Sequence, residues 1–141
     1  MSTETNKAIV RRYLEQVYNE GRTDLIEEFL AEEFDSHTNL PPGPEGVKMF
    51  YGASTAAFPD QRTTIEDVVA EGDKVVVRAT FKATHLGELL GIPPTGRSVT
   101  MSWISIYHLS NGKIVEHWYQ DDNMGLMQQL GVIPTPEGGE F

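Results

Sequence analysis

The hydrophobic period of this chain changes from helical to strand-like near Arg62, and that change limits the folds it can adopt. Before this point apolar residues recur at helical spacing, as Ile9, Tyr13 and Val17 illustrate. After it they alternate about every second residue, which is typical of half-buried strands. Helices followed by strands, without alternation between the two, predict an α+β domain with an antiparallel sheet.

The first half divides into three predicted helices. The first covers residues 6–19, the second begins at Asp24, and the third runs from Pro44 to Phe58. Each carries an apolar stripe on one face, and Pro44 suits the first turn of a helix. Residues 35–43, between the second and third helices, are rich in turn formers and include His37. We therefore expect about three N-terminal helices to pack on one face of the sheet.

The second half reads as four strands and a short closing helix. The strands are predicted at 64–70, 74–84, 97–109 and 113–120, and the helix at 123–130. The dipeptide Asn111-Gly112 is a strong signal for a two-residue hairpin turn between the last two strands. No linker or repeat interrupts the chain. We predict a single domain over 1–141, with a core at about 6–131 and a loose tail at 132–141.

Composition narrows the classes of partner. The 141 residues include 11 Lys and Arg against 21 Asp and Glu, for a formal net charge of −10. An acidic surface repels phosphate backbones and anionic lipid, so we expect no nucleic-acid or membrane partner. The chain has no Cys, which excludes thiol catalysis, disulfides and Cys-based zinc sites. The N-terminus lacks a signal-peptide pattern and the apolar runs are too short to span a membrane, so we expect a cytoplasmic location.

Several segments resemble the SnoaL-like polyketide cyclases of the NTF2-like superfamily. The strongest are Gly91-Ile-Pro-Pro-Thr-Gly-Arg97, Asn111-Gly-Lys-Ile-Val-Glu-His-Trp118 and Met124-Gly-Leu-Met-Gln-Gln-Leu-Gly131. Tyr13, the His37 segment and Phe58-Pro-Asp60 add landmarks, so the resemblance covers about 6–131. It implies a cone in which helices close over a strongly curved antiparallel sheet and enclose an apolar pocket. It also implies cofactor-independent acid–base chemistry on a small apolar or aromatic ketone or ester.

The hairpin turn predicts which side chains share the pocket face. If Ser110 lies opposite Lys113, then Tyr107 faces Glu116 and Ser105 faces Trp118. The predicted pocket set on these strands is Trp103, Ser105, Tyr107, Glu116, Trp118, Gln120 and Asp122. A shift of one residue would exchange the two faces and place Asp121 in the pocket in place of Asp122.

Asp122 is the predicted catalytic base, because the resemblance places the family's acidic residue there and a buried carboxylate can remove a C–H proton. The alternative is that Asp122 caps the last helix through the amide of Gly125. His37 and Tyr13 are the predicted donors to the substrate carbonyl or its enolate. The resemblance also implies a pocket histidine on the penultimate strand. The pocket positions there are Trp103, Ser105 and Tyr107, and His108 lies on the opposite face.

Further side chains are candidate ligand contacts. The predicted substrate-binding residues are Trp103, Ser105, Tyr107, Trp118, Gln120, His85 and Phe50. We expect His85 to have a structural or gating role at the pocket mouth. The four His residues lack metal-ligand spacing, so no metal site and no cofactor are predicted.

The leading hypothesis is a polyketide (ester) cyclase that closes a ring by an intramolecular aldol step. The alternatives are an isomerase, dehydratase or epoxide hydrolase that uses the same pocket, and a non-catalytic ligand-binding or dimerisation domain. The outer sheet face carries Ile104, Ile106 and Tyr119 in the predicted register, an apolar patch that a homodimer or higher homo-oligomer would cover.

Overall fold

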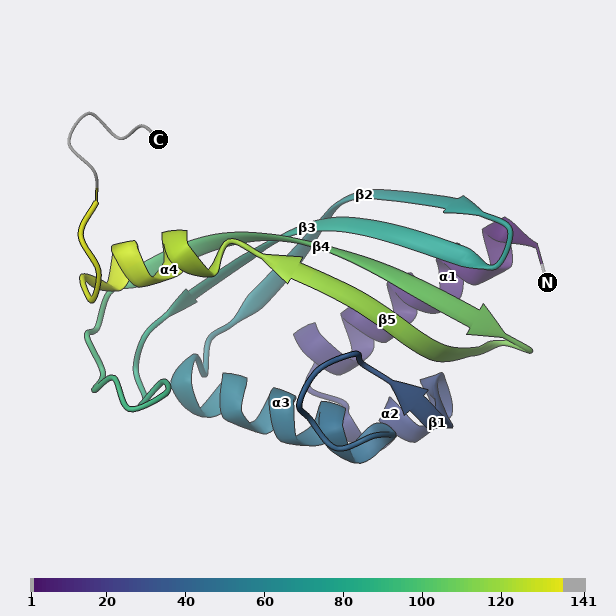
Figure 1. Ribbon diagram of the computed structural model, residues 1–141, viewed down its shortest axis with the longest axis horizontal. Helices are drawn as coiled ribbons and strands as arrows, with labels where there is room; N and C mark the ends of the chain where they lie inside the picture. The colour runs from purple at the N-terminus through teal and green to yellow at the C-terminus, as the bar shows by residue number, and fades with distance from the viewer. Residues whose placement is uncertain (1, 136–141) are drawn as a thin grey trace.

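In the computed structural model, which describes residues 2–135, the N-terminal helices lie under one face of a five-stranded sheet that arches over them (Figure 1). The helical elements are α1 (Thr3–Tyr13), η1 (Leu14–Asn19), η2 (Thr23–Leu25), α2 (Ile26–Phe29), α3 (Pro44–Ala57) and α4 (Asn123–Leu130). The strands are β1 (Leu30–Asp35), β2 (Arg62–Glu71), β3 (Lys74–Thr84), β4 (Ser98–Ser110) and β5 (Lys113–Asp121). The α+β class, the N-terminal helices and the short C-terminal helix are confirmed. Residues 136–141 of the predicted tail lie outside the described residues.

The predicted first helix is confirmed and begins three residues earlier than expected. Ser2 caps it, because its hydroxyl accepts a hydrogen bond from the amide of Thr5 at 3.1 Å. From Leu14 the helix widens into the π-helical turn η1, in which the amide of Glu20 donates to the carbonyl of Glu15. Gly21 follows at φ 74°, a left-handed conformation that suits glycine. This continuous helix crosses under the sheet and presents Tyr13 to the interior.

The predicted second helix is confirmed as the short elements η2 and α2, and a strand that was not predicted follows it directly. α2 ends at Phe29, and the chain continues as β1, which pairs in parallel with β5. The strand order is β1-β5-β4-β3-β2, so the sheet is mixed, with antiparallel pairing among β2 to β5. Leu30 and Phe34 are buried from β1. A strand of six residues that follows a helical apolar stripe has no periodicity of its own to reveal it.

The β4–β5 hairpin has the predicted turn but a different register. Asn111 and Gly112 have φ values of 50° and 80°, and Ser110 lies opposite Lys113. Val115 then forms a β-bulge, after which His108 pairs with Glu116 and Tyr107 with His117. The predicted pairing of Tyr107 with Glu116 is therefore wrong by one residue. Every side chain of β5 beyond the bulge faces opposite to the prediction.

One core joins the helices to the inner, concave face of the sheet. It is built around Val10, Tyr13 and Val17 from the first helix, and around Val75 and Val77 from β3. The inner face of β4 is buried at every second residue, which confirms the predicted facing of that strand. Among residues 2–135, no helix has both the length and the apolar character needed to cross a membrane.

Candidate active site

The inner faces of β4 and β5 meet the helices in an aromatic interior, and this is the candidate site. Trp103, Ser105 and Tyr107 lie on the buried face of β4, as predicted. Opposite them, β5 contributes His117, Tyr119 and Asp121. The bulge thus brings to this face three side chains, His117, Tyr119 and Asp121, that the sequence prediction placed on the outside.

His117 lies among aromatic rings on the inner face. Its ring centroid is 5.2 Å from that of Phe34 and 5.7 Å from that of Tyr107, both edge-on. Burial lowers the pKa of His117 to about 4, with a smaller lowering by His37 and a small opposing effect of Asp35. The imidazole is therefore neutral near pH 7.

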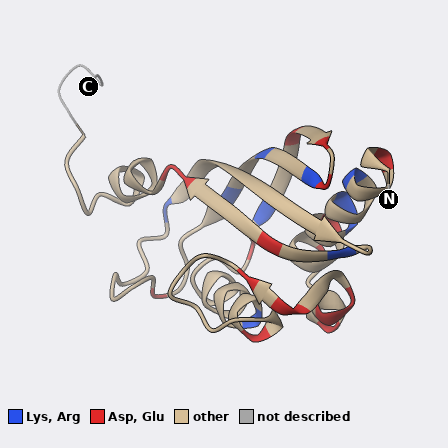
Figure 2. Ribbon diagram, turned by 45° about the vertical axis from the view of Figure 1, so that its right-hand side comes forward, with Lys and Arg blue, Asp and Glu red and all other residues tan. Residues whose placement is uncertain are grey.

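Tyr119 and Asp121 continue the inner face toward the end of β5. The Tyr119 ring lies 5.6 Å from that of Trp103. Burial raises the pKa of Tyr119 strongly, and the Asp121 carboxylate raises it further, so the phenol keeps its proton. His117 and Tyr119 are half-buried and Asp121 is exposed, so the interior becomes accessible toward the end of β5. Figure 2 shows acidic residues where β5 passes into α4.

Tyr13 reaches the same interior from α1. Its ring centroid lies 6.3 Å from that of Tyr107 and 5.7 Å from that of Tyr18. The side chain is 1% exposed, and its hydroxyl has no hydrogen-bond partner among the described residues. Burial, with smaller effects of Tyr18 and Tyr107, raises the pKa of Tyr13 well above its ordinary value. The interior therefore holds a buried, neutral phenol that enters from α1 beside Tyr18.

Asp122, the predicted base, lies at the N-terminus of α4. Its carboxylate accepts a hydrogen bond from the amide of Gly125 at 3.0 Å, so it caps the helix. The inner-face position belongs to Asp121, which pairs with Trp103 across the strands. The prediction placed Asp122 in the interior because it assumed a regular hairpin. The bulge at Val115 shifts the register by one residue, so this placement is wrong.

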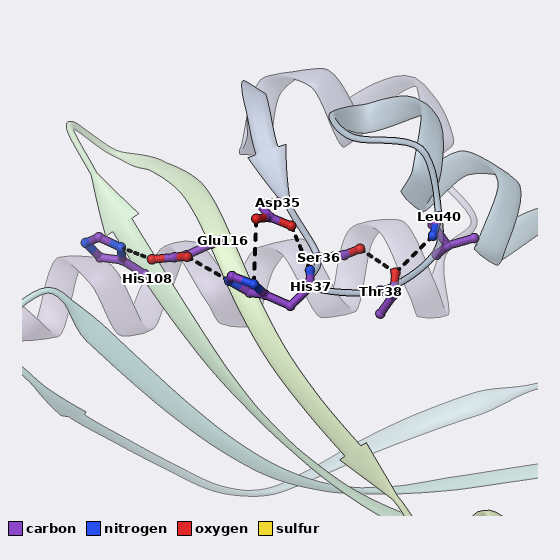
Figure 3. Close-up of polar contacts among 7 residues, drawn as sticks. All are labelled: Asp35, Ser36, His37, Thr38, Leu40, His108 and Glu116. Atoms are coloured by element: carbon purple, nitrogen blue, oxygen red, sulfur yellow. Dashed lines mark hydrogen bonds and ion pairs between the residues drawn. The ribbon is translucent and has the colours of Figure 1, made fainter.

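His37, Trp118 and Gln120 lie on the outer, convex face. The His37 ring stacks on Trp118 with centroids 4.9 Å apart and planes at 13°. Figure 3 shows His37 bound to Glu116 of β5, whose carboxylate also contacts His108 of β4. Trp118 and Gln120 were predicted as pocket walls, but the bulge turns both side chains outward. His37 stacks on Trp118 and therefore also lies outside.

His85 and Phe50 lie away from the inner face of β5. His85 is fully buried at the end of β3, and its Nδ1 accepts a hydrogen bond from the amide of Thr95 at 3.2 Å. Its backbone also pairs with Gly96 and Arg97, so it holds the 86–96 loop in place. Phe50 is 43% exposed on α3.

Two surface hollows that the structure shows lie away from His117, Tyr119 and Tyr13. They have volumes of about 370 and 430 Å³ and lie near the α1 N-terminus and along β1. Over residues 2–135, no group of three or more His, Cys, Asp or Glu side chains is arranged to hold a metal ion.

Sequence reasoning missed His117 and Tyr119 because it assumed a regular hairpin. One signal against that assumption was present. In the regular register Glu116 would point into the core beside Tyr107, where a carboxylate without a partner is costly. A bulge before Glu116 avoids this cost and turns His117 inward.

The sequence profile of the SnoaL-like polyketide cyclases matches residues 8–130. The chain belongs to the SnoaL-like polyketide cyclase family. Its relatives include three aklanonic acid methyl ester cyclases. DnrD of Streptomyces peucetius is 36% identical over 98% of each chain. DauD of Streptomyces sp. strain C5 is 36% identical over 92% of this chain and 84% of its own.

A solved structure extends the similarity to three dimensions. TsrD from Streptomyces laurentii matches with a TM-score of 0.87 and 30% sequence identity, over 94% of this chain and 99% of its own. The predicted family resemblance is therefore confirmed. In this SnoaL-like protein the inner face of β4 carries no histidine, and the inner-face histidine stands on β5 at position 117.

Proposed function

We propose that the protein is a polyketide cyclase that closes a ring in a polyketide methyl ester by an intramolecular aldol step. Membership of the SnoaL-like cyclases and the three aklanonic acid methyl ester cyclases among its relatives support this reaction class. The observation that carries the proposal is the neutral His117 on the same inner face as Tyr119, with the unpaired phenol of Tyr13 entering from α1.

In the proposed reaction His117 is the base. Its neutral imidazole takes a proton from the carbon next to a substrate carbonyl, and the electron pair moves onto the carbonyl oxygen. The phenols of Tyr13 and Tyr119 donate hydrogen bonds to this enolate oxygen. The enolate carbon then attacks a second carbonyl of the same molecule, which forms the new C–C bond. The resulting alkoxide takes the proton back from the imidazolium, so the product is an isomer of the substrate.

The charge around the interior favours a neutral substrate. Asp121 is exposed at the accessible end of β5, Asp122 follows it, and the chain carries a net charge of −10. A free carboxylic acid would be repelled there as its anion, whereas a methyl ester would not. We therefore expect the ester form to be turned over in preference to the acid.

Turnover of aklanonic acid methyl ester by the purified protein, followed by liquid chromatography and mass spectrometry, tests the proposal. A cyclised product has the mass of the substrate, whereas dehydration or epoxide opening changes the mass by one water. We expect His117→Gln to lower kcat by about 10²- to 10⁴-fold and Asp122→Asn to leave it nearly unchanged. The reverse pattern would return the base to Asp122, as the sequence predicted. Absence of turnover of the ester would refute the proposal.

We also propose a homodimer that uses the outer sheet face. With the observed register this face presents Ile104 (49% exposed) and Trp118 (38% exposed), while Tyr119 belongs to the interior. Exposed apolar groups of this size favour burial against a second copy. Light scattering coupled to size exclusion should give twice the chain mass, and Ile104→Glu should reduce it to the monomer. A monomeric wild type would refute this interface.

A further inference from the structure

Two registers are possible for β5, and the choice between them determines which of its side chains face the interior. In the regular hairpin Tyr107 faces Glu116, and Trp118 turns inward. In the observed one Val115 bulges, Tyr107 faces His117, and Trp118 turns outward. Both registers keep the Asn111-Gly112 turn, so the turn does not discriminate between them.

In the observed register Glu116 is held from two sides. Its Oε1 lies 2.9 Å from Nδ1 of His108, and its Oε2 lies 2.8 Å from Nε2 of His37 (Figure 3). We call these three residues the Glu116 clamp. Hydrogen bonds from His108, and then from His37, hold the pKa of Glu116 below its ordinary value, so the carboxylate is charged. Glu116 can make both contacts only when it points outward.

Both histidines of the clamp are themselves braced by carboxylates. Nε2 of His108 lies 2.8 Å from Asp73, and the backbone amide of His37 donates to Asp35 at 2.8 Å. His37 has a φ of 56°, a left-handed conformation that is unusual for a residue with a side chain. Its ring lies flat on Trp118, the aromatic residue that the bulge turns outward. The 36–43 segment thus binds features of β5 that exist only in the bulged register.

We infer that the Glu116 clamp selects the bulged register of β5, and that His37 and His108 are positioning residues for His117, Tyr119 and Asp121. The regular register would bury the Glu116 carboxylate beside Tyr107 without either imidazole. It would also remove the stack on Trp118. The register does not depend on the proposed function; only its consequence for catalysis does.

Glu116→Leu tests the inference, because it removes the clamp and places at 116 a side chain that the core accepts. Cross-strand proton contacts in NMR spectra report the register directly. We expect Tyr107 to contact His117 in the wild type and residue 116 in the variant. The matched control is Asp67→Leu, which removes a carboxylate of β2 that accepts a hydrogen bond from Arg78 of β3. This change should leave the Tyr107–His117 contact intact. Retention of that contact in Glu116→Leu would overturn the inference.

Deletion of Val115 in the Glu116→Leu background is the rescue. With this residue gone, a regular hairpin places residue 116 opposite His108 and His117 opposite Tyr107, without a bulge. We expect the native contact to return, which a loss of stability alone would not produce; failure of the folded deletion variant to restore it would count against the inference.

A third variant, His37→Ala/His108→Ala, covers the case in which neither of these folds. Its β5 amides should exchange with solvent at least about tenfold faster than those of Asp67→Leu, and equal protection would overturn the inference.

Activity separates this inference from the proposed function. If both hold, Glu116→Leu lowers kcat toward that of His117→Gln, and the Val115 deletion restores it. If the register shifts while His117→Gln remains active, the proposed function fails and the clamp stands.

Discussion

Replacement of Tyr13 by Phe should stabilise the protein and impair its chemistry. The Tyr13 side chain is 1% exposed, and its hydroxyl meets no hydrogen-bond partner in the part of the chain that the structure describes. A buried hydroxyl without a partner costs about 1–3 kcal/mol, and Phe keeps the ring that packs on Tyr18, Phe29 and Tyr107. We expect a gain of about 1 kcal/mol, equivalent to a rise in Tm of about 3–4 °C for a chain of this length.

The same substitution removes a donor to the enolate. Loss of one well-placed donor of this kind lowers kcat by about 10²-fold. Thermal and urea unfolding at pH 7, with turnover of aklanonic acid methyl ester measured on the same preparations, give the two quantities together. A gain in stability with a loss of turnover is the expected result for a donor kept free for a ligand.

Tyr51→Phe is the control, because Tyr51 is half-buried on α3 and its ring contacts Tyr18, which in turn contacts Tyr13. Its stability should stay within about 0.5 kcal/mol of the wild type. If Tyr13→Phe instead lowers the free energy of unfolding by 1 kcal/mol or more, the hydroxyl is hydrogen-bonded in solution. That result would refute the reasoning.

Three further outcomes are expected. Because burial lowers the pKa of His117 to about 4, the unfolded state binds more protons than the folded state between about pH 4 and 6.5, so stability rises with pH through this window. His117→Gln should remove up to about 3 kcal/mol of this rise in the free energy of unfolding, which urea titrations at several pH values measure. An unchanged rise would contradict the burial of His117. Asp122→Ala should lower stability by about 1 kcal/mol through loss of the α4 cap, without moving the NMR contact between Tyr107 and His117. Asn19→Ala removes two 2.8 Å hydrogen bonds to the backbone of Thr63 and should lower the free energy of unfolding by about 2 kcal/mol. A loss below about 0.5 kcal/mol would show that water replaces these hydrogen bonds.

Local signals decided the parts of the fold that the sequence predicted well. Helix α3 begins at Pro44, and α4 ends at Leu130, where Gly131 follows with a φ of 79°. The Asn111-Gly112 turn adopts left-handed backbone angles. In each case the residues that set the structure lie within a few positions of it.

Long-range contacts decided the parts that the sequence did not predict. Strand β1 forms because Leu30 and Asp35 pair with β5, more than 80 positions away. His117 entered the site, and Asp122 left it, because of one bulge at Val115.

By itself, then, the sequence determined the α+β class, the family, the β4 inner face and Tyr13 as an interior phenol. Only the tertiary structure decided which face of β5 meets them. Both faces of β5 carry aromatic side chains, so hydrophobic pattern alone favours neither register. The carboxylate of Glu116 is bound by His37, 79 residues away, and this contact exists only after the chain has folded.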